Sequence, residues 1–149
     1  MSVLATRRLF EFDITAYRFR SLIFAFPNKG IKLIKTILLI LLGLFFILNG
    51  INHLYNTHIL AEYAHRRGLV SPQLMVRISG IALIFGGLSL MTGFLKIYGI
   101  IGLSIFLVVS ALTIHQFWRE TEREMWMLEV THFAKNAAIL TELIYIATG

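Results

Sequence analysis

Four long apolar stretches separated by shorter polar connections form the main pattern of this chain. The first three run from about Thr36 to Leu54, from Ile78 to Leu95 and from Ile97 to Phe117. Each is close to the roughly 17–25 residues that an α-helix needs to cross a bilayer. The fourth begins near Val130 and is interrupted by Glu142. Because hydrocarbon offers no water to backbone groups, the pattern predicts an all-α fold, a bundle of four transmembrane helices.

The segment before the first apolar stretch has a different character. Residues 1–30 interleave arginines with aromatic residues, and we predict a basic N-terminal segment lying at the lipid headgroups, followed by a membrane domain at residues 31–149. The mixed residues that precede the apolar stretch do not resemble a cleavable signal peptide. A mitochondrial targeting sequence is the alternative, although Glu11 and Asp13 are atypical of one.

Composition supports the membrane interpretation. Hydrophobic residues make up 57% of the 149 residues and charged residues only 15%. A soluble domain of this size would have too little polar surface to cover so much apolar side chain. The chain has no cysteine, which excludes disulfides, cysteine-ligated zinc and iron–sulfur clusters bound by this chain alone.

The positive charge is unevenly distributed. Half of the 14 basic residues precede the first apolar stretch, where they would meet anionic headgroups, and no nucleic-acid-binding motif accompanies them. The positive-inside rule therefore places the N-terminus in the cytoplasm, and four crossings return the C-terminus there. We expect a multi-pass protein of a bacterial or archaeal plasma membrane.

This topology would bring most of the titratable groups to the outer face of the membrane. All five histidines fall on that side, namely His53, His58, His65, His115 and His132. Such clustering of titratable and aromatic groups at one end of a bundle is typical of a functional site. An aromatic belt at the membrane–water interface is the alternative explanation.

The fourth apolar stretch carries polar residues at helical spacing. Glu129, His132, Lys135 or Asn136, and Glu142 would share one stripe of a helix. Polar side chains are costly in hydrocarbon, so this stripe is predicted to face the bundle interior. Lys135 has the alternative of reaching outward to the interface.

Five residues near the third and fourth stretches form a candidate ligand pocket, namely His115, Trp118, His132, Lys135 and Asn136. His115 ends the third stretch and His132 begins the fourth, and the short connection predicts that the two helix ends are neighbours. Their hydrogen-bond donors suit the oxygen atoms of a quinone head group or a small oxyanion. Alternatively, these side chains only anchor the helices at the interface.

A metal site is a less favoured interpretation of a second histidine group. His58, Glu62 and His65 would share one face of a short helix over residues 57–67, which Gly68 and Pro72 are expected to end. Two imidazoles and a carboxylate are a ligand set for zinc or iron, but the spacing is not HExxH. Haem bound between opposed histidines is a further alternative, with the candidates His53, His115 and His132.

Small residues at helical spacing predict close helix packing. Gly43 shares a face with Gly50, and Gly80 shares one with Gly87; Gly99 and Gly102 open the third stretch, and Ala134 and Ala138 have small-xxx-small spacing in the fourth. No glycine is placed to form a phosphate-binding loop after a strand.

A succession of short motifs resembles a known family of membrane proteins. GINHL, AEYAHRRGLVSP, SGIALIFGGLSLMTG, HQFW and HFAKNAAIL occur in this order between Gly50 and Leu143. This succession resembles the DoxX family of small four-helix membrane proteins. The resemblance implies an integral membrane protein connected with respiratory redox chemistry, either as a subunit of a quinone oxidoreductase or as a membrane partner of redox enzymes.

Three functions are therefore considered. The first is a subunit of, or partner to, a quinone-linked redox complex, with a site at the outer ends of the third and fourth helices. The second is a structural or assembly subunit without a ligand of its own, and the third is a small transporter. The expected partners are the lipid bilayer, other membrane or redox subunits and, alternatively, further copies of the chain; nucleic acid is not expected.

Overall fold

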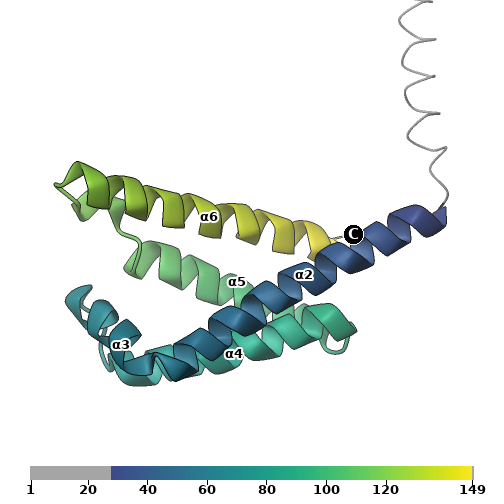
Figure 1. Cartoon of the computed structure of the whole chain (residues 1–149), viewed down its shortest axis with the longest axis horizontal. Coiled ribbons are helices and arrows are strands. Elements are labelled where there is room, and N and C mark those ends of the chain that lie inside the picture. Colours follow the sequence, from purple (N-terminus) through teal and green to yellow (C-terminus); the bar gives the residue numbers. More distant parts are fainter. Residues whose placement is uncertain (1–27, 149) are drawn as a thin grey trace, which may run out of the picture. The chain divides into compact units, whose positions relative to one another are not determined.

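The computed structural model describes residues 28–148, so residues 1–27 of the predicted N-terminal segment lie outside the described part. The described elements are α2 (Asn28–Tyr55), α3 (Thr57–Arg66), α4 (Pro72–Thr92), α5 (Lys96–Thr113), the 3-10 helix η1 (Phe117–Arg119) and α6 (Arg123–Thr148) (Figure 1). All regular structure in residues 28–148 is helical, which confirms the all-α prediction.

Three of the described helical segments are long and apolar enough to cross a membrane. They are Lys29–Tyr55, Pro72–Thr92 and Lys96–Arg119. Together with the composition, they identify an integral membrane protein. α6 has 26 residues but is not among these three segments.

The helices extend beyond the apolar stretches that predicted them. α2 begins at Asn28, before the predicted start at Thr36, and α4 begins at Pro72, before Ile78. Hydropathy marks where a helix meets lipid, whereas backbone hydrogen bonding continues through the polar residues at its ends. α4 stops short of the predicted Leu95 because Gly93 adopts a left-handed conformation with φ of 76°.

Within the described residues, 39–148 form one compact unit, and the helix packing of the core belongs to this unit. α4 packs against α5, α5 against α6, and α3 against α4. The core consists of large apolar side chains, namely Phe46, Leu83, Leu90, Ile100, Leu103, Leu107 and Leu143. Leu143, near the end of α6, joins residues from the end of α4 and the start of α5, so α6 follows α5 along most of its length.

Glycines allow α2 and α4 to approach closely. A Cβ atom on Gly87 would lie 2.5 Å from the backbone oxygen of Gly43, and one on Gly50 would lie 2.7 Å from the oxygen of Gly80. The predicted close helix packing at the glycines of the first two stretches is therefore confirmed, and the structure adds that these glycines meet one another across α2 and α4. Ala134 and Ala138 are exposed, so their small-residue spacing does not serve packing within residues 39–148.

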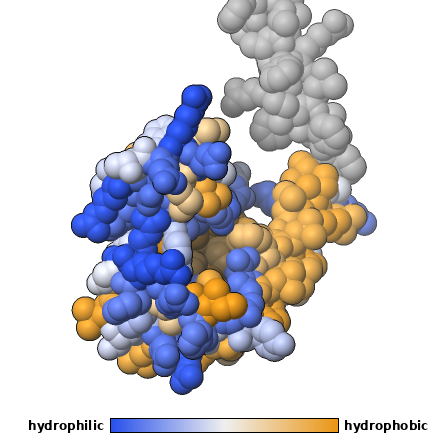
Figure 2. Space-filling view, turned by 60° about the vertical axis from the view of Figure 1, so that its left-hand side comes forward, coloured by the Kyte–Doolittle hydropathy of each residue, from blue (hydrophilic) through white to orange (hydrophobic). Residues whose placement is uncertain are grey.

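Three connections, α2–α3, α3–α4 and α5–α6, gather at one end of this unit, whereas the α4–α5 turn lies at the other end. α3, the start of α4, the end of α5, η1 and the start of α6 lie near one another there (Figure 1). Hydrophilic side chains concentrate over this end, as Figure 2 shows. The bundle therefore has one polar end, and this end carries the histidines.

Substituting Gly87 by alanine tests the glycine contact. We expect Gly87→Ala to lower the free energy of unfolding by about 1–3 kcal/mol, because the new methyl group meets backbone that cannot rotate away. Unfolding titrations in mixed micelles would measure the change. Gly102→Ala is the matched control, since a Cβ there meets nothing within 4 Å. Equal stability of the two variants would contradict the packing.

Candidate functional site

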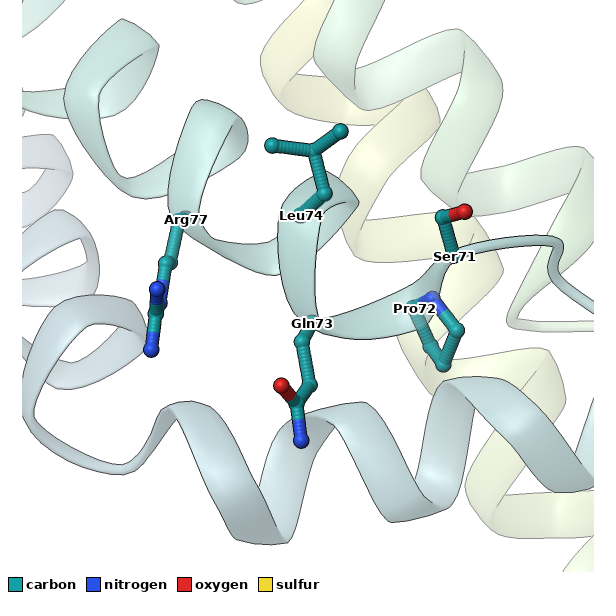
Figure 3. A pocket seen from close by; sticks show the side chains of 5 residues that line it. All are labelled: Ser71, Pro72, Gln73, Leu74 and Arg77. Carbon is teal, nitrogen blue, oxygen red and sulfur yellow. The ribbon is translucent and has the colours of Figure 1, made fainter.

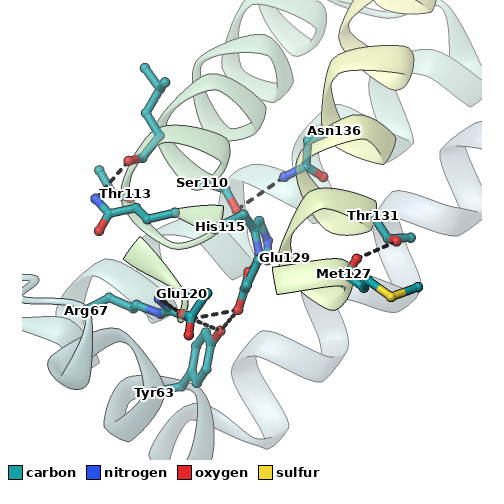
Figure 4. Close-up of polar contacts among 12 residues, drawn as sticks. Tyr63, Arg67, Ser110, Thr113, His115, Glu120, Met127, Glu129, Thr131 and Asn136 are labelled. Carbon is teal, nitrogen blue, oxygen red and sulfur yellow. Dashed lines mark hydrogen bonds and ion pairs between the residues drawn. The ribbon is translucent and has the colours of Figure 1, made fainter. Parts of the chain in front are cut away.

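A buried carboxylate, that of Glu129, occupies the centre of the polar end. Glu129 lies in the second turn of α6 and has 0% of its surface exposed. It accepts hydrogen bonds from the hydroxyl of Tyr63, from Nη2 of Arg67 at 2.7 Å and from Nδ1 of His115 at 2.8 Å (Figure 4). Three donors from two other parts of the chain therefore compensate one buried negative charge.

α3 and its C-cap residue, Arg67, supply two of these donors because of their helical spacing. Tyr63 and Arg67 lie four residues apart, so both face the same side, and Nη2 of Arg67 also donates to the Tyr63 hydroxyl at 2.9 Å. Nη1 of Arg67 binds Glu120 at 2.6 Å, and the Arg67 side chain is only 12% exposed. One guanidinium thus bridges two carboxylates from the segment that follows α5.

The surroundings keep Tyr63 in its protonated form. Burial raises the pKa of its phenol, and the hydrogen bond to Glu129 raises this pKa further. Tyr63 therefore remains a hydrogen-bond donor to the carboxylate throughout the neutral pH range.

A cavity of about 100 Å³ lies beside this network, between α2, α4, α5 and α6. Its polar lining consists of Asn49, His53, Ser110, His115, Lys135 and Asn136. Its apolar lining consists of Phe45, Phe46, Leu83, Phe106 and Leu107. The cavity therefore combines hydrogen-bonding groups with aromatic walls.

His115 connects the cavity to the network. Because Glu129 accepts a hydrogen bond at Nδ1, that nitrogen carries a hydrogen, and Nε2 is left to interact with a ligand. Asn136 is 5% exposed and its amide nitrogen lies 3.4 Å from Oγ of Ser110. His53, which lines the cavity from α2, forms a 2.7 Å hydrogen bond between its Nδ1 and Oγ of Ser79.

The structure brings together four of the five predicted pocket residues. His115, Lys135 and Asn136 line the cavity, and His132 stacks on His115 with ring centroids 4.9 Å apart. Trp118 lies elsewhere. Its ring packs on Phe117 and Phe133 and the residue is 52% exposed.

The misplacement of Trp118 has a simple cause. The prediction ended the third helix at about Phe117 and placed Trp118 one turn beyond His115. α5 ends at Thr113, and the chain then leaves the helix and forms η1, which turns Trp118 away from the cavity.

The polar stripe of α6 is only partly directed inward. Glu129 and Asn136 are buried, whereas Glu142 is exposed, so the prediction that Glu142 faces the bundle interior is wrong. The buried line runs through Glu129, Asn136 and Leu143 at intervals of seven residues, close to two helical turns. Glu142 precedes Leu143 and therefore lies about 100° away from this line.

Sequence reasoning missed several members of the site. Asn49 and Ser110 of the cavity lie in apolar stretches without a motif, and Tyr63, Arg67 and Glu120 were not recognised as partners of Glu129. The spacing of Tyr63 and Arg67 was the available signal. Their carboxylate partners are more than 50 residues away in sequence, which no local pattern reveals.

The histidines of α3 do not form a metal centre with Glu62. Within residues 28–148 there is no group of three or more histidine, aspartate or glutamate side chains arranged to hold a metal ion. Glu62 instead forms a 2.7 Å ion pair with Arg66 on the surface of α3.

Comparison with known proteins identifies the family. The DoxX family model matches residues 34–116, more than half of the chain. The chain belongs to the DoxX family. No curated protein and no solved structure matched it.

The DoxX match covers only one side of the site. It includes α3, α4, α5 and thus Tyr63, Arg67 and His115, but ends before Glu129 and the rest of α6. In this DoxX protein, the carboxylate that binds those three residues therefore comes from outside the matched range.

Two glutamates with ion pairs of the same length allow a matched test of the network. Glu129 is buried, whereas the side chain of Glu62 is 57% exposed, and each lies 2.7 Å from an arginine. We expect Glu129→Gln to lower the free energy of unfolding by roughly 3–5 kcal/mol, because it leaves buried charge on Arg67 poorly compensated.

Glu62→Gln is the control, with an expected loss below about 1 kcal/mol, because water screens the exposed pair. Thermal unfolding in detergent would compare both variants with the wild type. A Glu129→Gln variant as stable as Glu62→Gln would show that the network does not hold the polar end together.

Proposed function

We propose that this DoxX-family protein is a membrane subunit of a quinone-linked redox complex, and that its cavity binds the carbonyl edge of a quinone head group. The observation that carries the proposal is the position of His115, whose Nδ1 is occupied by Glu129 while the ring lines the cavity. This arrangement leaves one ring nitrogen in a fixed orientation for a ligand.

The lining matches both redox forms of such a ligand. A quinone carbonyl accepts hydrogen bonds, which Lys135 and the amide of Asn136 can donate. The hydroxyl of the reduced form donates, and neutral His115 accepts at Nε2. Phe45, Phe46 and Phe106 provide apolar surface for the ring.

The cavity volume limits how much of a ligand enters. At about 100 Å³ it is somewhat smaller than an engineered cavity of about 150 Å³ that binds benzene. One edge of a quinone ring fits this space, with the isoprenoid tail remaining in the bilayer. The volume also suits a small oxyanion, which would use the same donors.

Electron transfer requires a partner. Cysteine is absent, so this chain alone cannot bind an iron–sulfur cluster through thiolates. No side chain of the cavity carries electrons by itself, and the proposal therefore includes a second redox subunit that holds the electron-carrying group.

A second candidate function is that of an assembly subunit, and the position of Glu142 favours it. Glu142 lies on the exposed side of α6 and has no ion pair within residues 39–148. A carboxylate facing the membrane is costly, and a donor on a helix of another subunit would compensate it.

The proposal includes α6 as a fourth transmembrane helix, which gives residues 31–149 the form of a four-helix membrane domain. Its 26 residues span about 39 Å, enough for the bilayer core. The packing of Leu143 with Leu90 and Ile100 supports a crossing alongside α5. With the basic N-terminus in the cytoplasm, four crossings return the C-terminus there.

Lys135→Met tests ligand binding. We expect quinone affinity to fall about tenfold or more, because a charge-assisted hydrogen bond is lost while the side-chain length is kept. Binding of a short-chain quinone to the protein in lipid nanodiscs would be measured, together with thermal stability. Lys96→Met, at the other end of α5, is the control and should bind normally.

Two further variants separate the two candidate functions. Asn136→Leu should weaken quinone binding without releasing partner subunits. If α6 docks another chain, Glu142→Gln should release partner subunits without weakening quinone binding. Unchanged quinone binding in both Lys135→Met and Asn136→Leu would refute the cavity as a quinone site.

Single cysteines test the topology, since the native chain has none to interfere. Ile59→Cys on α3 should be labelled by an impermeant maleimide added outside intact cells, and Thr148→Cys should be protected until the membrane is opened. Both positions are exposed in the structure. Labelling of Thr148→Cys from outside would show that α6 does not cross.

A further inference from the structure

An open groove lies at the polar end and shares no lining residue with the cavity. Its volume is about 490 Å³, and it is formed by the end of α2, the start of α3 and the first turns of α4. Its lining includes Leu54, Tyr55, His58, Gln73, Arg77 and Ile81. A second hollow beside Ser71 and Leu74 shares Gln73 and Arg77 with it (Figure 3).

The groove is lined by hydrogen-bond donors and basic groups without a carboxylate. Gln73 and Arg77 lie one turn apart on α4 and point to the same side (Figure 3). Arg77 is exposed and has no ion pair within residues 39–148. The imidazole of His58 adds a further donor from α3. The lining therefore favours a ligand that carries negative charge.

Arg77 lies near one end of a helix that is long and apolar enough to cross a membrane, so its long side chain can extend outward to the headgroups. α4 is one of the membrane-crossing segments, and Arg77 is five residues from its start at Pro72, about 8 Å along the helix axis. From this position an arginine side chain that extends outward meets the phosphates of the surrounding lipids. Ile81 lies one turn deeper on the same helix, and Leu54 lines the groove from α2.

We propose that this groove binds one anionic phospholipid, with its phosphate at Arg77 and Gln73 and its acyl chain along Leu54 and Ile81. Charge selects the headgroup. A zwitterionic lipid would bring its own cation toward Arg77 and His58, where no carboxylate lines the groove to receive it. A net negative lipid has no such cation. This site is separate from the quinone cavity and does not rest on it.

Native mass spectrometry of the full-length protein in detergent, titrated with lipids of matched chains, would test the site. Phosphatidylglycerol should bind at least about fivefold more tightly than phosphatidylcholine, since one basic residue near headgroups contributes about 1 kcal/mol. Arg77→Gln should remove this preference, and Arg77→Lys should retain most of it.

Arg66→Gln is the matched control, because Arg66 lies on the neighbouring α3 but is paired with Glu62 and does not line the groove. Equal binding of the two lipids, or equal loss of the preference in Arg66→Gln and Arg77→Gln, would overturn the proposal. Competition by glycerol phosphate at lipid-like concentrations would also overturn it, because the groove would then recognise a phosphate without its acyl chains.

Discussion

The polar end of this protein depends on the compensation of one buried negative charge. Glu129 accepts hydrogen bonds from Tyr63, Arg67 and His115, and these donors come from α3 with its C-cap residue and from the connection that follows α5. A buried carboxylate without partners would be too costly to keep ionised. The same contacts therefore fix α3 against α6, set the orientation of His115 and bring Glu120 beside Arg67. The geometry of the cavity follows from this, since His115 forms part of its wall.

Close apolar packing of the helices supports the hydrogen-bond network around Glu129. Gly43 and Gly87 allow backbone contact between α2 and α4, and Gly86 accommodates the side chain of Leu103 from α5. Leu103 and Leu143 are completely buried, so apolar side chains fill the bundle interior beyond the polar end. Polar groups within this packing, such as Asn136 and Ser110, then border a cavity of limited size that the helices cannot easily close. The proposed ligand site therefore depends on two features, close backbone contact between helices and a polar cavity that the side chains do not fill.

α6 has two chemically different sides. Its inner line runs through Glu129, Asn136 and Leu143, whereas Glu142 and the alanines at 134 and 138 are exposed. Small and polar residues on the exposed side of a helix near hydrocarbon suit contact with another helix better than contact with lipid. The inner side would thus hold a ligand and the outer side a partner, and both roles agree with a subunit of a larger membrane complex. The groove at Arg77 lies on α4 and concerns lipid instead.

The sequence by itself determined the class of protein, the helical fold and the polar character of one end. Apolar length and the absence of water in a bilayer leave helices as the solution, and glycine spacing indicated which faces pack closely. It also indicated that His115, His132, Lys135 and Asn136 belong to one region. Only the tertiary structure decided the partners of Glu129, because Tyr63 and Arg67 are distant in sequence and contact its carboxylate only when the helices pack. It also decided that Trp118 lies outside the cavity and that Glu142 is exposed. The position of the Trp118 side chain depends on where α5 ends, and that of Glu142 depends on which side of α6 is buried. Local hydropathy does not specify either the helix end or the buried side.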